Sequence, residues 1–356
     1  MTSIKKIAAA LAAAVLAVTA SACHPKDEVA VTVGKVKFTS AYYMCALINA
    51  DSEGKSKVKE NLSDSESSSD IDYYSKKIDN KSFVKWVEDT ALDNLKLIAA
   101  YKTLCEENKL ELSEDDVNTA EQYASYYWTN YGYSSYFEPN GVSQKTYTQY
   151  MKDSYFSGLY FEHLYGAEGT KAIDAETVKN KIYENFVIAD VINASYTSKT
   201  DDEKTELKNK FDTYAEELKK GSRTFEEVYK DYNGSTDEDS STETDEKTPK
   251  DKYASIIGNK DTAYESDNFD EINKMATGEV KVIELADSAG IMLVVKQDIK
   301  SDDYYTENLD LSARHLIADD EYEKDMKEYA SKLKTDVNNY AVKQFKVKKI
   351  KEPSSN

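Results

Sequence analysis

Apolar residues in the first half of this chain recur with the period of an α-helix. Between residues 80 and 108 the apolar side chains are three or four positions apart. They are Val84, Val87, Ala91, Leu95, Ile98, Tyr101 and Cys105. Because this spacing returns to one side of a helix at every turn, the segment is predicted to be one long helix with a single buried stripe.

Capping residues predict where other helices begin. Ser113 precedes Asp116 by three positions, and Asp174 precedes Thr177 by the same distance, which is the spacing of helix N-caps. Near the N-terminus, apolar residues alternate on both sides of Gly34, which predicts a strand, a turn and a strand. The predicted elements are this hairpin at 29–38, a helix at 39–50 that Thr39 caps, and helices at 113–131, 143–165 and 174–186.

From residue 187 onward, short β-branched runs alternate with short helical patterns. Strands are predicted at 187–196, 253–257 and 290–296, helices at 201–220, 225–232 and 270–275, and then a helix at 319–334 and a strand at 341–350. The chain is therefore predicted to be an α+β protein. It would have a helical domain at 29–186, a small α+β domain at 187–299, and a C-terminal helix and strand, 300–350, that pack back on the N-terminal domain.

Two polar stretches interrupt these elements. Residues 49–72 are mostly Ser, Asp, Glu and Lys, and residues 235–252 contain no apolar side chain and many acids. Segments of this composition bury too little apolar surface to offset the entropy of ordering them. We expect a mobile surface insertion at 49–72 and a solvated acidic loop at 235–252.

The first 22 residues have the pattern of an export signal. Lys5 and Lys6 precede an apolar stretch, residues 7–20, whose helix would rise only about 21 Å, short of the roughly 30 Å hydrocarbon core of a bilayer. Small residues then lead to Cys23. We expect lipid attachment at Cys23, residues 23–28 as a tether, and a position on the outer face of the cell membrane. Cleavage without lipidation, and plain secretion, is the alternative.

Charge and composition exclude several kinds of site. The chain has 46 Lys and Arg against 66 Asp and Glu, a formal net charge of −20. Proteins that follow nucleic-acid phosphates need clustered basic residues, so no nucleic-acid partner is expected. The only arginines are Arg223 and Arg314, which argues against bidentate phosphate recognition. Neither the cysteine nor the histidine spacing resembles a metal site, so no metal or cofactor is predicted.

Two cysteines follow the predicted signal segment and Cys23. Cys45 and Cys105 both lie on apolar helical stripes. They are expected to be buried free thiols that pack as small apolar side chains. A disulfide between them is the alternative, because an exported protein meets oxidising conditions.

Aromatic residues crowd the segment 123–137. One helix face cannot bury all of them, so several are expected to line a surface cleft. Aromatic side chains can bind varied apolar segments of an unfolded polypeptide. The candidates for such contacts are Tyr126, Trp128, Tyr131, Tyr133 and Phe137.

The order of these elements resembles the PrsA/SurA group of extracytoplasmic foldases, in which a helical chaperone domain is combined with a parvulin-type peptidyl-prolyl isomerase domain. Residues 29–43 (VAVTVGKVKFTSAYY) look like the opening strands and helix of the group. Residues 223–232 (RTFEEVYKDY) and 269–280 (FDEINKMATGEV) are similar to parvulin segments, the second ending in Gly-Glu-Val. Residues 287–296 look like the last parvulin strand.

The resemblance implies a folding factor whose partners are unfolded or newly exported polypeptides. Parvulin sites carry one histidine on the first strand and one on the last. Here Ser195 stands at the first position, and Met292 or Leu293 at the second, depending on a one-residue gap. Loss of both imidazoles implies a binding groove with weak or absent isomerase activity.

Two other classes of function are weighed against this one. A non-catalytic lipoprotein that binds peptide or glycan at the cell surface is the alternative, because aromatic rings also stack on sugars. A hydrolase has little support, since the chain has neither G-x-S-x-G nor H-E-x-x-H.

Overall fold

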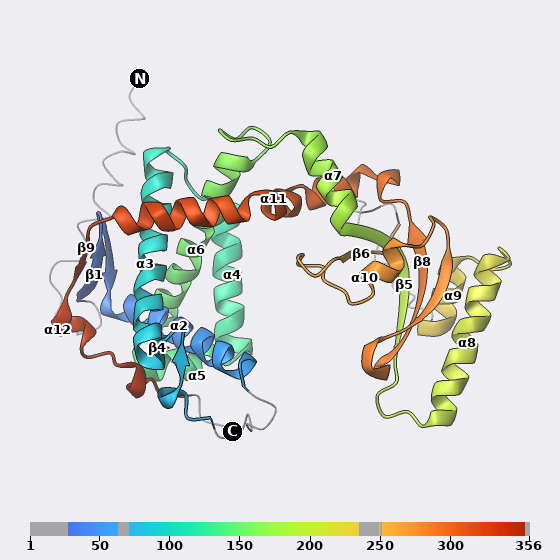
Figure 1. Ribbon diagram of the computed structural model, residues 1–356, viewed down its shortest axis with the longest axis horizontal. Coiled ribbons are helices and arrows are strands. Elements are labelled where there is room, and N and C mark those ends of the chain that lie inside the picture. Colours follow the sequence, from blue (N-terminus) through green and yellow to red (C-terminus); the bar gives the residue numbers. More distant parts are fainter. Residues whose placement is uncertain (1–27, 63–70, 235–248, 250, 353–356) are drawn as a thin grey trace. The chain divides into compact units, whose positions relative to one another are not determined.

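The computed structural model describes residues 28–62, 71–234, 249 and 251–352 (Figure 1). The chain is an α+β protein, as predicted. The predicted signal segment, Cys23 and most of the tether lie outside the described residues, as do 63–70 and nearly all of the acidic loop. Among the described residues, no helix is both long enough and apolar enough to span a membrane.

The chain divides into two compact units. The first unit comprises the described residues up to Phe161 together with those from Glu323 onward, and the second runs from Glu162 to Tyr322. Residues 162–186, which the sequence pattern assigned to the helical domain, therefore belong to the second unit. The C-terminal region is also shared, because its residues up to Tyr322 belong to the second unit and the rest to the first.

The first unit consists of helices and a small hairpin that packs against α2 and α3. Its elements are β1 (Val29–Val33), β2 (Val36–Thr39), α2 (Ser40–Glu60), η1 (Tyr73–Ser75), β3 (Lys77–Ile78), β4 (Lys81–Ser82), α3 (Phe83–Glu107), α4 (Glu114–Asn130), α5 (Tyr133–Phe137), η2 (Glu138–Asn140), most of α6 (Gln144–Tyr165), the last part of α11 (Asp303–Lys332), β9 (Thr335–Val337), α12 (Asn339–Val342) and η5 (Val347–Lys349). Gly34, at φ 59°, makes the predicted turn between β1 and β2. The Thr39 and Ser113 caps form as predicted.

Helix α2 continues well into the segment predicted to be a mobile insertion. Asp51 and Val58 are buried on it, and the backbone of Gly54 approaches the rings of Phe83 and Trp86. A Cβ at Gly54 would lie 3.1 Å from Phe83 and 3.2 Å from Trp86. The polar composition did not indicate this helix, because a glycine, rather than a large apolar residue, faces the rings of α3 at this point.

A buried carboxylate joins three helices of the first unit. Asp153 of α6 accepts hydrogen bonds from Tyr42 of α2 at 2.8 Å, Lys102 of α3 at 2.6 Å and Gln149 at 2.9 Å. Asp153 is only 2% exposed, so the partners replace the water that its charge has lost. Nearby, Cys45 and Cys105 are buried free thiols, and burial raises the pKa of both.

The C-terminal part of the chain returns to the hairpin of the first unit. Strand β9 pairs antiparallel with β1, with Val31 opposite Val337, so the sheet order is β2-β1-β9. Asn338 follows β9 and donates from Nδ2 to Glu28 at 2.9 Å and to the Val29 carbonyl at 3.2 Å. Its Oδ1 accepts from the amides of Tyr340 and Ala341, which begin α12.

The strand predicted at 341–350 does not form. This segment contains α12, an irregular stretch and η5, and its most buried residues are Ala341, Val347 and Ile350. That spacing fits neither a strand nor a continuous helix, so the segment packs by individual side chains. We call residues 338–350 the tail.

The second unit is built on a four-stranded antiparallel sheet of order β6-β5-β8-β7. Its elements are α7 (Ala175–Asn185), β5 (Phe186–Ser195), α8 (Asp201–Lys219), α9 (Phe225–Asn233), β6 (Ala254–Gly258), α10 (Phe269–Asn273), β7 (Val280–Glu284), η3 (Ala286–Ser288), β8 (Gly290–Gln297), η4 (Ile299–Ser301) and the first part of α11 (Asp303–Lys332). Helices α8 and α9 cover one face of the sheet and α10 covers the other (Figure 1).

Helix α11 begins at Asp303, sixteen residues before the start predicted from the sequence (319 − 303 = 16). Leu309 and Ala313, four positions apart, pack against Val178 and Ile182 of α7. The buried Arg314 pairs with Asp310 at 2.6 Å and donates to the Tyr165 carbonyl at 2.8 Å. One of the two arginines therefore has a structural role.

Replacing Asn338 by alanine tests how far the stability of the first unit depends on the contact between β1 and the C-terminal part of the chain. Asn338→Ala removes the side-chain bonds to Glu28 and Val29 and the cap of α12. We expect the free energy of unfolding of the first unit to fall by roughly 1–2 kcal/mol. Urea unfolding followed by tryptophan fluorescence reports on this unit, because Trp86 and Trp128 both lie in it. The matched control is the exposed Asn339→Ala, and equal midpoints for the two variants would contradict the expectation.

Candidate functional site

Tyrosines at the end of α4 and the start of α5 form a surface cluster, which we call the tyrosine patch. It consists of Tyr123, Tyr126, Tyr127, Tyr131 and Tyr133. The side chains of Tyr123 and Tyr126 are each 49% exposed and that of Tyr131 is 63% exposed. Such a contiguous group of exposed rings is the kind of surface that contacts a partner.

The half-buried Tyr127 holds the tyrosine patch together. Its ring centroid lies 5.3 Å from that of Tyr131 and 5.6 Å from that of Tyr133. The ring of Tyr126 lies 6.1 Å away and that of Tyr123 lies 6.3 Å away. These are ordinary distances for ring pairs, so the exposed rings are ordered by their neighbours before any ligand binds.

The other two aromatic candidates, Trp128 and Phe137, lie in the core. Trp128 is 5% exposed and Phe137 is 1% exposed, and both rings contact the buried Tyr147. Trp128 follows Ala120 and Ala124 at four-residue steps and so falls on the buried face of α4. Trp128 and Phe137 are therefore not available for direct contact with a client, and this part of the sequence prediction is corrected.

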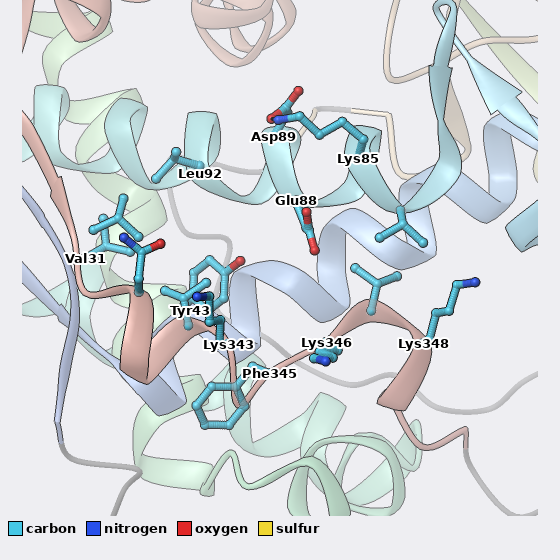
Figure 2. Close-up of a pocket in the computed structure, with 15 residues that line it drawn as sticks. Val31, Tyr43, Lys85, Glu88, Asp89, Leu92, Lys343, Phe345, Lys346 and Lys348 are labelled. Carbon is cyan, nitrogen blue, oxygen red and sulfur yellow. The ribbon is translucent and has the colours of Figure 1, made fainter.

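A groove separates α3 from the tail, and we call it the α3–tail groove (Figure 2). Its volume is about 520 Å³, within the usual range of ligand sites. Tyr43 of α2 lies on its floor, Val84 and Leu92 line the α3 wall, and Val342 and Phe345 line the tail wall. This groove could not be predicted from the sequence, because its walls are more than 200 residues apart in the chain.

Charges of both signs border the apolar lining of the groove. Lys343, Lys346 and Lys348 stand on the tail wall, and Glu88 points from α3 toward the tail (Figure 2). Burial, and secondarily the charge of Glu88, raises the pKa of Tyr43 to about 12. The tyrosine is therefore a neutral hydroxyl at physiological pH.

The sheet of the second unit does not place Ser195, Met292 and Leu293, the three positions singled out in the sequence, on one face. Met292 on β8 lies directly opposite Asn193 on β5, and Ser195 lies opposite Gly290. Directly paired residues share a face, so Ser195, Asn193 and Met292 are all on the face that α10 covers. Leu293 points to the other face, where it packs with α8 and α9. The structure therefore joins Ser195 with Met292 and separates both from Leu293.

The α10 face combines a packed apolar region with polar residues at its end. Phe269, Met275 and Met292 are all at most 7% exposed and pack together. Asn193 and Ser195 are exposed. The Ser195 hydroxyl bonds to Thr197 at the end of the strand. Asn193 was missed in the sequence, and only the strand register shows that it stands opposite Met292.

The described part of the second unit contains His163 on α6 and His315 on α11, and no histidine on the four strands. His315 Nδ1 lies 2.7 Å from Asp319 on the same helix.

Arg223, the other arginine, bonds to Glu217 at 3.2 Å and to Asp231 at 3.3 Å. No group of three metal-binding side chains is found in the portion of the chain that the structure describes.

A buried carboxyl group lies at the centre of the same sheet. Asp190 of β5 is 3% exposed, and its Oδ2 accepts from Gln297 at 2.6 Å, while its Oδ1 has no hydrogen-bond partner among the residues that the structure describes. Burial, and then the neighbouring Asp251 carboxylate, raises the pKa of Asp190 to about 7. Burial and the charges of Asp251, Asp302 and Asp190 also raise the pKa of Tyr305 to about 12.

Comparison with solved structures finds several chains that match this one. The chain resembles the crystal structure of foldase protein PrsA from Streptococcus pneumoniae str. Canada MDR_19A, with 17% sequence identity and a TM-score of 0.39. The similarity covers 71% of this chain and 87% of that chain. Neither the models of protein families nor the curated proteins contain a match.

Asp190 makes the stability of the second unit depend on pH. Because its pKa in the folded state is above the value near 3.9 of an unfolded aspartate, the folded state holds this proton more tightly. The stabilisation is complete below about pH 4 and is lost as the pH rises to about 7. Asp190→Asn mimics the neutral form and should stabilise the protein at pH 8 by at most about 4 kcal/mol, since each unit of pKa difference corresponds to about 1.4 kcal/mol.

Urea unfolding followed by far-ultraviolet circular dichroism at pH 5 and pH 8 measures this effect. The exposed Asp212→Asn on α8 is the control for the loss of one negative charge. If the two variants gain the same free energy of unfolding at pH 8, the buried charge of Asp190 does not destabilise the folded state.

Proposed function

We propose that this chain is an extracytoplasmic protein-folding factor that binds unfolded or newly exported polypeptides. In this proposal Cys23 carries a lipid that anchors the chain to the outer face of the membrane. The observation that carries the proposal is the tyrosine patch, in which Tyr126 and Tyr131 are exposed and held by ring contacts. The export signal and the order of elements in the sequence support it.

The tyrosine patch suits a surface that must accept many sequences. A tyrosine ring offers an apolar face and a hydroxyl, and its side chain loses little entropy because it has few rotatable bonds. Tyr126 and Tyr131 contact each other edge to face at 5.5 Å, so part of that entropy is already lost in the free protein. The patch can therefore contact exposed apolar segments of a client without requiring one sequence.

The second unit supports a module that is related to prolyl isomerases but has weak or no activity. Its order of elements, β5-α8-α9-β6-α10-β7-β8, contains the three strands and three helices predicted from the sequence between 187 and 299, and adds the strand β7, which the sequence analysis missed. Isomerisation of an X–Pro bond requires a pocket that lowers a barrier of about 18–20 kcal/mol. Asn193, Ser195 and Met292 stand on the face in question, and none of them is an imidazole.

A glycan-binding lipoprotein is the second candidate, and the exposure of Tyr131 favours it. A ring that is 63% exposed presents a face on which a sugar can stack. Trp128 cannot serve this purpose because it is buried. Binding of a glycan array by the chain, abolished by Tyr131→Ser, would support this function over client binding.

Replacing the exposed rings tests the proposed client surface. The double variant Tyr126→Ser, Tyr131→Ser removes two exposed rings while leaving Tyr127 and the core in place. We expect it to suppress the aggregation of a chemically unfolded model protein at least threefold less well at equal concentration, measured by light scattering. The control is Tyr340→Ser, which removes a tyrosine that is 73% exposed and lies outside the patch. Wild-type suppression by the double variant would contradict the role of the patch.

Prolyl isomerase activity is tested separately from client binding. In a protease-coupled assay on a proline-containing peptide, we expect a rate close to the uncatalysed one, because the α10 face lacks both imidazoles. Turnover at the level of an active parvulin would show that Asn193, Ser195 and Met292 are sufficient for catalysis. That result would refute the weak activity and leave client binding unaffected.

A further inference from the structure

We propose that the α3–tail groove binds extended polypeptide segments in which acidic side chains alternate with apolar ones. This inference rests on the proposed function, because it names the class of client segment that one site of the folding factor would accept. It adds a binding site that is separate in sequence from the tyrosine patch and has a different chemistry.

The lining of the groove provides contacts for apolar side chains. Val84 and Leu92 on one wall and Val342 and Phe345 on the other are all half-buried, so their remaining surface faces the groove. A volume of about 520 Å³ accommodates several side chains of an extended segment. Burial of apolar surface here would contribute affinity without selecting a sequence.

The selectivity comes from lysines on the tail wall. Lys343, Lys346 and Lys348 are exposed, and none of them forms an ion pair with another described residue. Lys348 lies over the Tyr74 ring at 5.5 Å, and this ring contact is not an ion pair. On α11, by contrast, Lys327 pairs with Glu323 at 2.6 Å, as is common for helix surfaces.

This local excess of positive charge is unusual in a chain with a net charge of −20. Most of the surface would repel an acidic segment, so the groove is where such a segment gains both apolar contact and an ionic partner. The opposite wall has the reverse charge at Glu88. Acidic side chains of a bound segment should therefore point toward the tail, and Glu88 should weaken their binding.

The shape of the site favours a polypeptide over a membrane surface. Lysines that bind lipid headgroups must reach a flat layer of charge, whereas Lys343 and Lys346 border a concave apolar groove. Glu88 faces the same space, and Asp89 lines it while paired with Lys81 at 2.9 Å and with Lys85. These carboxylates would repel an anionic membrane surface, whereas a single polypeptide chain is narrow enough to bind without contacting them.

The test uses three fluorescein-labelled peptides of equal length in which leucine alternates with Asp, Asn or Lys. Fluorescence anisotropy with the full chain should show that the Asp peptide binds at least tenfold more tightly than the Asn peptide, and that the Lys peptide binds most weakly. The preference should decrease when the salt concentration is raised, because the charges lie at the surface. Equal affinity for the Asp and Asn peptides would overturn the proposal.

Charge variants connect the binding to the groove. The triple variant Lys343→Gln, Lys346→Gln, Lys348→Gln should lose most of the preference for the Asp peptide. The matched control is Lys35→Gln, Lys37→Gln, Lys145→Gln, which removes three exposed lysines of the same unit outside the groove. Glu88→Gln should tighten binding of the Asp peptide about twofold to threefold, so the proposal can still be tested if the triple variant does not fold.

Two outcomes would overturn the inference in different ways. If both triple variants bind the Asp peptide equally, the groove is not the site of selectivity. If Lys343→Gln, Lys346→Gln, Lys348→Gln loses binding to vesicles of phosphatidylglycerol while keeping its preference among the peptides, the lysines serve a membrane contact. In either case, aggregation suppression that depends on Tyr126 and Tyr131 would leave the proposed function intact.

Discussion

The pairing of β9 with β1 is the constraint on which the first unit depends. Three residue pairs join these strands, and Asn338 adds bonds to residues at the start of β1. This contact places the tail against α3 and so creates one wall of the α3–tail groove. Such a small interface can do this because the intervening chain folds into compact structure, which reduces the entropy lost on bringing distant residues together.

The sequence predicted well those features that depend on neighbouring residues. The caps at Thr39, Ser113 and Asp174 and the turn at Gly34 all formed, because each depends on bonds or dihedral angles within a few residues. The tail was predicted wrongly because its conformation is set by packing on α3 and β1 and not by its own period. The burial of Trp128 was also predictable from periodicity. Trp128 follows Ala120 and Ala124 in four-residue steps, and this spacing places its indole ring on the buried face of α4.

The candidate sites differ in how much of each the sequence could show. The tyrosine patch lies within one segment, so its location was predictable, but which rings are exposed required the packing of α4. The α3–tail groove was not predictable, because Glu88 and Lys346 meet only through the strand pairing. On the sheet of the second unit, the register made Asn193 rather than Ser195 the partner of Met292, and the sequence contained no signal for that offset.

The first unit is discontinuous in sequence, and this has a consequence for the order in which the protein matures. A chain made from its N-terminus onward completes the second unit, Glu162–Tyr322, before β9 and the tail have emerged. Until then β1 has an open edge and the tail wall of the groove does not exist. The chain therefore acquires its groove only at the last step of its own synthesis, so an incomplete copy lacks the site that we propose for acidic and apolar segments.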